Sequence, residues 1–248
     1  MKPQNHPMIL PRQIIAAFLE LAFIPVLFLV SADEYTIKAV LLMFWITISE
    51  MMAPTILKKI GVYGLKKTFL YYLPFYVFII PLVFYHNRQQ FDFCSIVFGT
   101  TVVCILLCLN RKEIAQITNS LESKRPIAKD KFVVRLFTNL VPIISEEILF
   151  RGFWISSNGT CAESSVVLTS ALLFVYAHFI NRWANVMYKI KNYIMQFLLG
   201  LILAIVFVQT RSLLACCFMH FLYNISDFIL LIKRYRAKEQ TSLFNDYG

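Results

Sequence analysis

Two adjacent carboxylates and an arginine occur inside a long apolar run, Val141-Pro-Ile-Ile-Ser-Glu-Glu-Ile-Leu-Phe-Arg-Gly-Phe-Trp154. A charged side chain at the centre of a bilayer costs about 2.5–3.5 kcal/mol on insertion scales, so each of these groups needs a reason to be there. Glu147 and Arg151 are four residues apart, which predicts an ion pair on one helix face with the acid in the favourable N-terminal position. Glu146 points about 100° away from that face. One carboxylate is therefore neutralised locally, and the other is free to do chemistry.

Two later apolar runs supply imidazoles. One contains Phe174-Val-Tyr-Ala-His178, and the other contains His220-Phe-Leu-Tyr-Asn224. His220 and Asn224 are four residues apart and so share a helix face. A carboxylate with two imidazoles can bind a metal, activate a water molecule, or do both, and an Asn can donate a hydrogen bond to a developing oxyanion.

Each of these features has an ordinary explanation when taken alone. A single intramembrane His is often a packing residue, and a Glu–Arg pair can simply hold helices together. Their occurrence together on three segments favours a functional site. The other buried acids have no such company, and we expect each to face a cavity, pair with a neighbour or lie near an interface. They are Glu20, Glu50, Asp92 and Asp227.

The composition is that of a membrane protein. Of 248 residues, 58% are hydrophobic and 15% are charged, too few polar residues to cover the core of a soluble domain. At about 20 residues per span, we expect an all-α polytopic bundle of about eight transmembrane helices. The expected spans are 13–32, 36–57, 68–86, 92–110, 132–156, 164–182, 192–210 and 213–232.

Basic residues are distributed unevenly between the loops of this arrangement. Nineteen Lys and Arg fall on one side, whereas Lys38, Arg88 and Arg211 fall on the other. Because cytoplasmic loops carry the excess of Lys and Arg, we expect both termini to be cytoplasmic. The same rule accounts for the net charge of +10, so no nucleic-acid partner is expected.

The motifs resemble, as a set and in order, those of the CAAX prenyl endopeptidase and bacteriocin-processing family (CPBP, or Abi) of intramembrane peptidases. The resemblance covers about residues 130–230. It rests on Glu146-Glu147-Ile-Leu-Phe-Arg151-Gly152, Phe174 to His178, Phe197 to Leu213, and His220 to Asn224. A Gly often follows the Thr that precedes the last motif, where this chain has Arg211.

The resemblance implies a role for each motif residue. Glu146 is the expected general base, activating a water molecule together with His178. His220 and Asn224 are expected to stabilise the oxyanion of the tetrahedral intermediate. Every motif position is filled, so the resemblance implies an active enzyme.

The same resemblance implies that Glu147 and Arg151 orient and balance the site. It favours a glutamate-type mechanism that requires no cofactor. Zinc is the alternative, because one Glu and two His from three helices form a ligand set that suits it. The sequence contains no His-Glu-x-x-His motif.

We expect a single integral membrane domain over 1–248. Residues 1–130 form its variable N-terminal helices, 131–232 the peptidase-like core, and 233–248 a basic cytoplasmic tail. The expected location is a bacterial cell membrane. The expected partners are the lipid bilayer and a peptide or protein substrate, such as a bacteriocin, a signalling-peptide leader or a CAAX-type C-terminus. Oligomeric state is left open by the sequence.

Two other classes of function compete with the peptidase. One is a non-catalytic bacteriocin-immunity or membrane scaffold protein. The other is a proton-coupled transporter, since buried Glu and His also serve in proton relays. The complete set of motifs favours the enzyme over both.

Straight spans would keep two of the proposed catalytic residues apart. At 1.5 Å per residue, Glu146 would lie about 20 Å from the inner end of its span, whereas His178 would lie near the inner end of its own. A break at Pro142 would place Glu146 less deep. We therefore expect the helix boundaries of the fifth segment to differ from 132–156.

Overall fold

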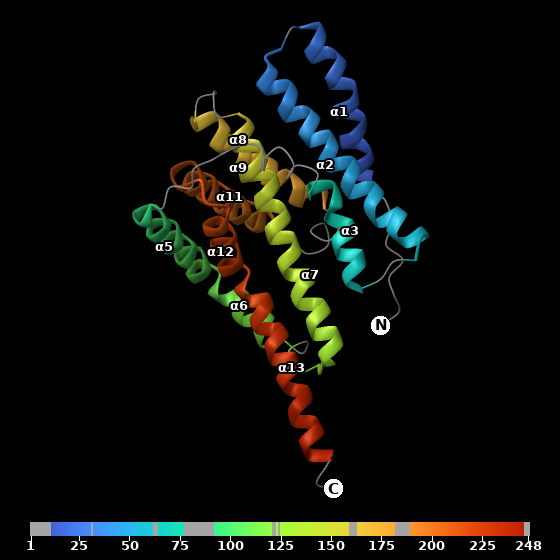
Figure 1. The fold of residues 1–248 in the computed structure, drawn as a ribbon, viewed down its shortest axis with the longest axis vertical. Coiled ribbons are helices and arrows are strands. Elements are labelled where there is room, and N and C mark those ends of the chain that lie inside the picture. Colours follow the sequence, from blue (N-terminus) through green and yellow to red (C-terminus); the bar gives the residue numbers. More distant parts are fainter. Residues whose placement is uncertain are drawn as a thin grey trace.

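The computed structural model describes residues 11–30, 32–61, 64–76, 92–120, 123, 125–158, 163–181 and 189–245. The elements described in these ranges are helices and contain no strand, which confirms the predicted all-α class (Figure 1). In chain order they are α1 (Pro11–Leu29), α2 (Glu34–Lys59), α3 (Gly64–Tyr76), α5 (Phe93–Leu109), α6 (Arg111–Thr118), α7 (Lys129–Glu147), the π-helix η2 (Ile148–Phe153), α8 (Trp154–Ser157), α9 (Glu163–Ile180), α11 (Ile190–Thr210), α12 (Leu213–Tyr223) and α13 (Ile225–Asn245).

Four helices of the described chain are long and apolar enough to cross a membrane: α1, α2, α9 and α11. Two bent pairs raise this number to six if each pair is one span, α5 with α6 at 68° and α12 with α13 at 60°. A polytopic helical membrane protein is thus confirmed. The segment expected as a span over 213–232 is bent by 60° between α12 and α13.

The count of eight spans is not reached in the described ranges, for two reasons. Helix α3 covers the start of the expected third span, and residues 77–86 of that span lie outside the described ranges. Helix α7 is too highly charged to count as a simple apolar span, because its sequence, KDKFVVRLFTNLVPIISEE, carries six charged residues. The cytoplasmic placement of the termini stays a prediction.

Polar residues fix several helix starts. The side chain of Asp33 accepts a hydrogen bond from the backbone N–H of Thr36 at the start of α2. Ser212 does the same for the N–H of Ala215 at the start of α12. Such caps satisfy N–H groups that have no partner within the helix. Asp92, one of the acids without an assigned role, caps α5 in this way.

Helix α11 ends on an unusual residue. Arg211 has φ 52° and ψ 22°, the left-handed conformation, at the C-terminal cap. Glycine adopts this conformation without a Cβ penalty and is the usual residue there. The departure from the family pattern noted at Arg211 therefore falls at a position where glycine is physically preferred.

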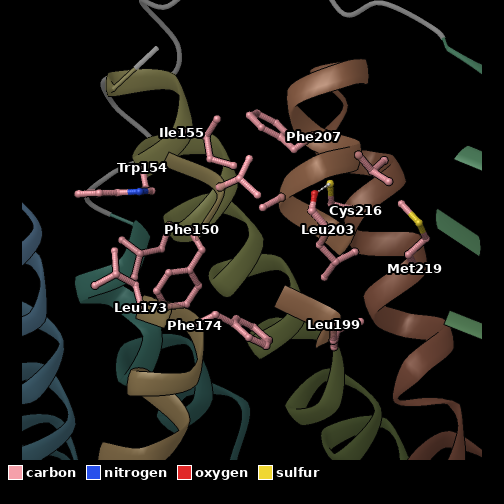
Figure 2. Packing of buried hydrophobic residues seen from close by; sticks show 14 of the residues in the cluster. Phe150, Trp154, Ile155, Leu173, Phe174, Leu199, Leu203, Phe207, Cys216 and Met219 are labelled. Carbon is pink, nitrogen blue, oxygen red and sulfur yellow. Dashed lines mark hydrogen bonds between the residues drawn. The ribbon is translucent and has the colours of Figure 1, made fainter. Parts of the chain in front are cut away.

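The core forms where η2, α8 and α9 meet α11 and α12 (Figure 2). Phe150 and Phe174 lie edge to face, with ring centroids 5.6 Å apart, and both are fully buried. Across from them, Cys216 donates through Sγ to the carbonyl of Leu203, 3.4 Å away, which joins α12 to α11. This rigid contact region supports the ends of the helices that carry the motif residues.

Helices α9 and α11 approach closely at Gly200. A Cβ on Gly200 would lie 3.2 Å from Cα of Ala171 and 3.2 Å from Cδ1 of Phe174. Because the helix axes can approach only when no side chain intervenes, Gly200 fixes the spacing of this pair. The close approach also brings the carbonyl of Gly200 to the buried Arg151.

Helix α1 packs beside α2 and is attached to α9 by polar contacts. The side chain of Gln13, with no exposed surface, donates through Nε2 to the carbonyl of Ile180, 3.0 Å away. Arg12 donates to the carbonyl of Asn181 at 2.7 Å. Glu20 accepts hydrogen bonds from Thr47 of α2 and Tyr176 of α9. Glu20, for which the sequence suggested only general possibilities, thus pairs with neighbours.

Candidate active site

The motif residues come from four elements. Glu146 and Glu147 end α7, Arg151 lies in η2, His178 lies near the end of α9, and His220 lies in α12. Helices α7 and α12 pack together, and η2 touches both α9 and α11. Segments that are distant in sequence therefore meet around the end of α7.

Glu147 is held in a fully buried ion network. Its Oε1 lies 3.3 Å from a terminal nitrogen of Arg151 and 2.8 Å from Nδ1 of His220. The side chains of Glu147 and Arg151 have no exposed surface. The predicted pairing of Glu147 with Arg151 is confirmed, and the structure adds His220 as a second partner of the same oxygen.

Arg151 is held on three sides. Besides Glu147, it donates to the carbonyl of Gly200 at 3.0 Å, and its guanidinium lies over the ring of Phe174, 4.7 Å from the centroid. A buried guanidinium needs such partners because its desolvation is costly. Arg151 therefore joins η2 to both α9 and α11.

Glu146 differs from its neighbour in both exposure and pairing. Its Oε2 lies 3.9 Å from Nε2 of His220, too far for a direct hydrogen bond. Its side chain is 15% exposed, whereas that of Glu147 is not exposed at all. A spacing of this size can be bridged by a water molecule. The predicted division into one neutralised and one available carboxylate thus has a geometric basis.

The ring of Phe174 connects the two imidazoles. Its centroid lies 4.6 Å from that of His178 and 5.6 Å from that of His220. With Arg151 above it, Phe174 touches three of the six motif side chains. In the sequence, Phe174 is only one position of a motif, because its contacts depend on how α9 lies relative to α12.

The hydrogen bonds define the tautomers of both histidines. His178 Nδ1 lies 2.9 Å from the carbonyl of Phe174. A carbonyl only accepts, so Nδ1 carries the proton, and Nε2 is the unprotonated nitrogen of the neutral ring. Nδ1 of His220 likewise donates to the Glu147 carboxylate, and its Nε2 is turned toward Glu146.

Asn224 lies one turn after His220, and its backbone N–H donates to the carbonyl of His220 at 3.1 Å. It caps the end of α12, where the chain bends into α13, and it lines a polar pocket with Glu113, Asn192 and Asp227. The structure thus brings Glu146, Glu147, Arg151 and His220 into one network, connects His178 to it through Phe174, and places Asn224 about one helical turn from His220.

The break in the fifth segment is not at Pro142. Helix α7 runs through Pro142 to Glu147, and the irregularity is the π-helix η2 that follows. A π-helical turn changes the direction of the side chains that follow it and is frequent at functional sites. The prediction of altered boundaries is confirmed, but the proposed cause is wrong.

Sequence reasoning missed Glu50 of α2. Only 3% of this residue is exposed. Its carboxylate accepts a hydrogen bond from Tyr71 of α3, and it lies within electrostatic range of Glu146. A buried acid in an apolar segment was the available signal, but nothing in the spacing tied it to the three motifs.

The described residues contain no group of three or more His, Cys, Asp and Glu side chains arranged to hold a metal ion. His220, one of the two histidines of the ligand set considered for zinc, bonds through Nδ1 to Glu147. The choice between a glutamate-type and a metal-dependent mechanism stays a prediction.

Residues 128–226, less than half of the chain, match the family described as Type II CAAX prenyl endopeptidase Rce1-like. We call this range the Rce1-like segment. The assignment made from the three motifs is thereby confirmed. No curated protein and no solved structure matches the chain.

The Rce1-like segment contains every motif residue, from the start of α7 to the beginning of α13. The match supports a protease of the intramembrane CAAX type acting on a membrane-associated peptide. Glu50 and Tyr71, which adjoin the site from α2 and α3, lie outside the Rce1-like segment.

Proposed function

We propose that this protein is an intramembrane endopeptidase in which Glu146 is the general base. The observation that carries the proposal is the difference between the two adjacent carboxylates. Glu147 is buried against Arg151 and His220, whereas Glu146 is partly exposed and faces Nε2 of His220 without bonding to it directly. A general base must be able to reach a water molecule, and Glu146 is the carboxylate that can do so.

The reaction needs only water and the peptide. Glu146, together with His178, accepts a proton from water as its oxygen attacks the carbonyl carbon of the scissile bond. The tetrahedral intermediate then collapses, the C–N bond breaks, and the proton passes to the leaving nitrogen. One product ends in a carboxyl group and the other begins with an amine.

His220 and Asn224 stabilise the oxyanion in this proposal. Because Nδ1 of His220 donates to Glu147, donation from Nε2 requires the doubly protonated ring. Asn224 reaches the oxyanion from the pocket beside the α12–α13 bend, so the scissile carbonyl lies between the two residues.

An apolar pocket bears on the class of substrate. It has a volume of about 500 Å³ and lies between α2 and the η2–α8 part of the Rce1-like segment. Trp45 and Trp154 line it. Its volume and lining suit a hydrocarbon chain, which favours a CAAX-type C-terminus over an unmodified leader peptide.

The experiment is cleavage of candidate substrates by the purified protein in liposomes, with Glu146→Ala and His178→Ala beside the wild type. The panel contains a farnesylated CAAX peptide, a leader peptide and a membrane protein segment. Cleavage that both substitutions abolish supports the proposal. Cleavage that survives both would exclude this site as the catalytic one, and failure of the wild type to cleave any member of the panel would favour a scaffold or immunity role.

A further inference from the structure

A polar pocket of about 490 Å³ lies next to the proposed site, where α5 turns into α6, α11 begins and α12 bends into α13. Carboxamide side chains from each of these places line it: Asn110, Gln116, Asn192, Gln196 and Asn224. Asn224 is the motif residue that lines it, about 6 Å along the α12 axis from His220. The pocket therefore adjoins the reacting groups.

Asn110 is the most informative residue of this pocket. It is 9% exposed, and its Oδ1 is buried without a hydrogen-bond partner. It occupies the N-cap position of α6, where an Asn normally bonds to the first turn, yet its side chain makes no capping hydrogen bond. A buried acceptor without a partner destabilises a fold. Its retention is explained if a ligand supplies the missing donor.

The charged residues of the pocket do not favour a charged ligand. Glu113 is paired with Lys191 at 3.0 Å. The remaining lining charges, Asp227 and Lys189, have opposite signs. Carboxamides, in contrast, present an N–H donor and a carbonyl acceptor in the same geometry as a peptide unit. The lining thus complements a peptide backbone.

We propose that this pocket is a substrate subsite that binds the backbone of an extended polypeptide segment beside the scissile bond. The Asn110 carboxamide rotates there, so that Oδ1, which is closed to solvent in the ligand-free chain, accepts from a substrate N–H. An extended segment has no hydrogen bonds within itself, so its backbone N–H groups are available to the carboxamides of the pocket. The inference rests on the proposed peptidase function and adds a place where the polar part of the substrate is held.

The test exploits opposite effects on stability and binding. Asn110→Leu keeps the number and branching of the side-chain heavy atoms and removes the buried acceptor, so the melting temperature in detergent should rise. Binding of a fluorescein-labelled farnesylated CAAX peptide, measured by polarisation in a Glu146→Gln background, should weaken about tenfold. A merely structural role of Asn110 predicts a lower melting temperature instead.

Asn119→Leu is the matched control. Asn119 caps the other end of α6 and accepts a hydrogen bond from Lys233 at 3.1 Å, outside the pocket. This variant should bind the labelled peptide as the parent does. A set of peptide probes, each methylated at one backbone nitrogen, adds a second readout. The probe that lacks the N–H bonded by Asn110 should bind the parent more weakly than the unmethylated peptide does, whereas Asn110→Leu should bind both equally.

Three results would overturn the subsite. Equal affinity of the parent and Asn110→Leu, a lower melting temperature of the variant, or failure of the parent to bind any probe overturns the subsite. Cleavage by the chain with Glu146 intact is scored separately. If binding depends on Asn110 but no peptide is cleaved, the subsite is supported and the peptidase function is contradicted. If a peptide is cleaved but its binding does not depend on Asn110, the peptidase function is supported and the subsite is contradicted.

Discussion

His220 lies between the two adjacent carboxylates of α7, with Nδ1 2.8 Å from Oε1 of Glu147 and Nε2 3.9 Å from Oε2 of Glu146. One imidazole thus bonds to the buried acid and faces the accessible one. This arrangement gives neighbouring residues of the same type different tasks. Glu147 supports the site, and Glu146 is left for the substrate side.

Glu147→Gln should strongly destabilise the protein. It removes the carboxylate that compensates the buried Arg151, and breaking a buried ion pair costs about 3–5 kcal/mol. Thermal unfolding in detergent measures the effect. Glu146→Gln serves as the control, since Glu146 makes no direct ion pair at hydrogen-bond distance, and it should change stability by about 1 kcal/mol or less. Equal losses in both variants would contradict the division of roles.

Gly200→Ala should reduce both stability and activity. The added Cβ would lie 3.2 Å from the backbone of Ala171 and from Phe174, so α9 and α11 must separate slightly. We expect a loss of about 1–3 kcal/mol, as for other overpacked sites. Activity should fall with it, because the carbonyl of Gly200 holds Arg151. An unfolding curve like that of the wild type would show that the helix pair tolerates the methyl group.

Gln13→Leu tests whether α1 positions His178. The substitution removes the hydrogen bond to the carbonyl of Ile180, two residues after His178, and leaves that buried carbonyl unsatisfied at a cost of about 1–3 kcal/mol. We expect kcat to fall while KM changes little. Ile15→Leu, at an exposed position of the same helix, should leave both constants unchanged. A loss in both variants would point to general damage of α1.

Arg211→Gly should stabilise the protein. A non-glycine residue in the left-handed conformation costs about 1–2 kcal/mol, and the greater freedom of glycine in the unfolded chain offsets part of the gain. We expect a net increase of about 1 kcal/mol in unfolding free energy, with cleavage unaffected. Gly61→Ala, where φ is +65° and nothing lies within 4 Å of an added Cβ, should lower stability by strain alone. Stabilisation by both substitutions would refute the conformational argument.

The sequence was most informative where local spacing determines contact. Glu147 and Arg151 pair as their separation of four residues predicts, because both lie on the same face of one continuous helical segment. The family assignment was also within reach, since the three motifs occur in a fixed order. These features need no knowledge of how the helices pack.

Contacts between helices were harder to foresee. That His220 bonds to Glu147, and that Phe174 contacts both histidines, depends on the angle between helices far apart in the chain. The position of Glu50 near Glu146 has the same origin. The bend at Asn224 has no Pro or Gly beside it in the sequence, and Gly152, which lies within the π-helix, does not by itself predict a π-helical turn. Residue spacing along one helix could not reveal either.

The most direct test of the central claim is hydrolysis by the purified, liposome-reconstituted chain in ¹⁸O-labelled water, comparing wild type with Glu146→Gln. The account predicts one ¹⁸O in the newly formed carboxyl group of the wild-type product. It also predicts a fall in kcat of about 10²–10⁴-fold in the variant, with its melting temperature nearly unchanged. A variant that hydrolyses the peptide within a few fold of the wild-type rate would contradict the assignment of Glu146 as the general base.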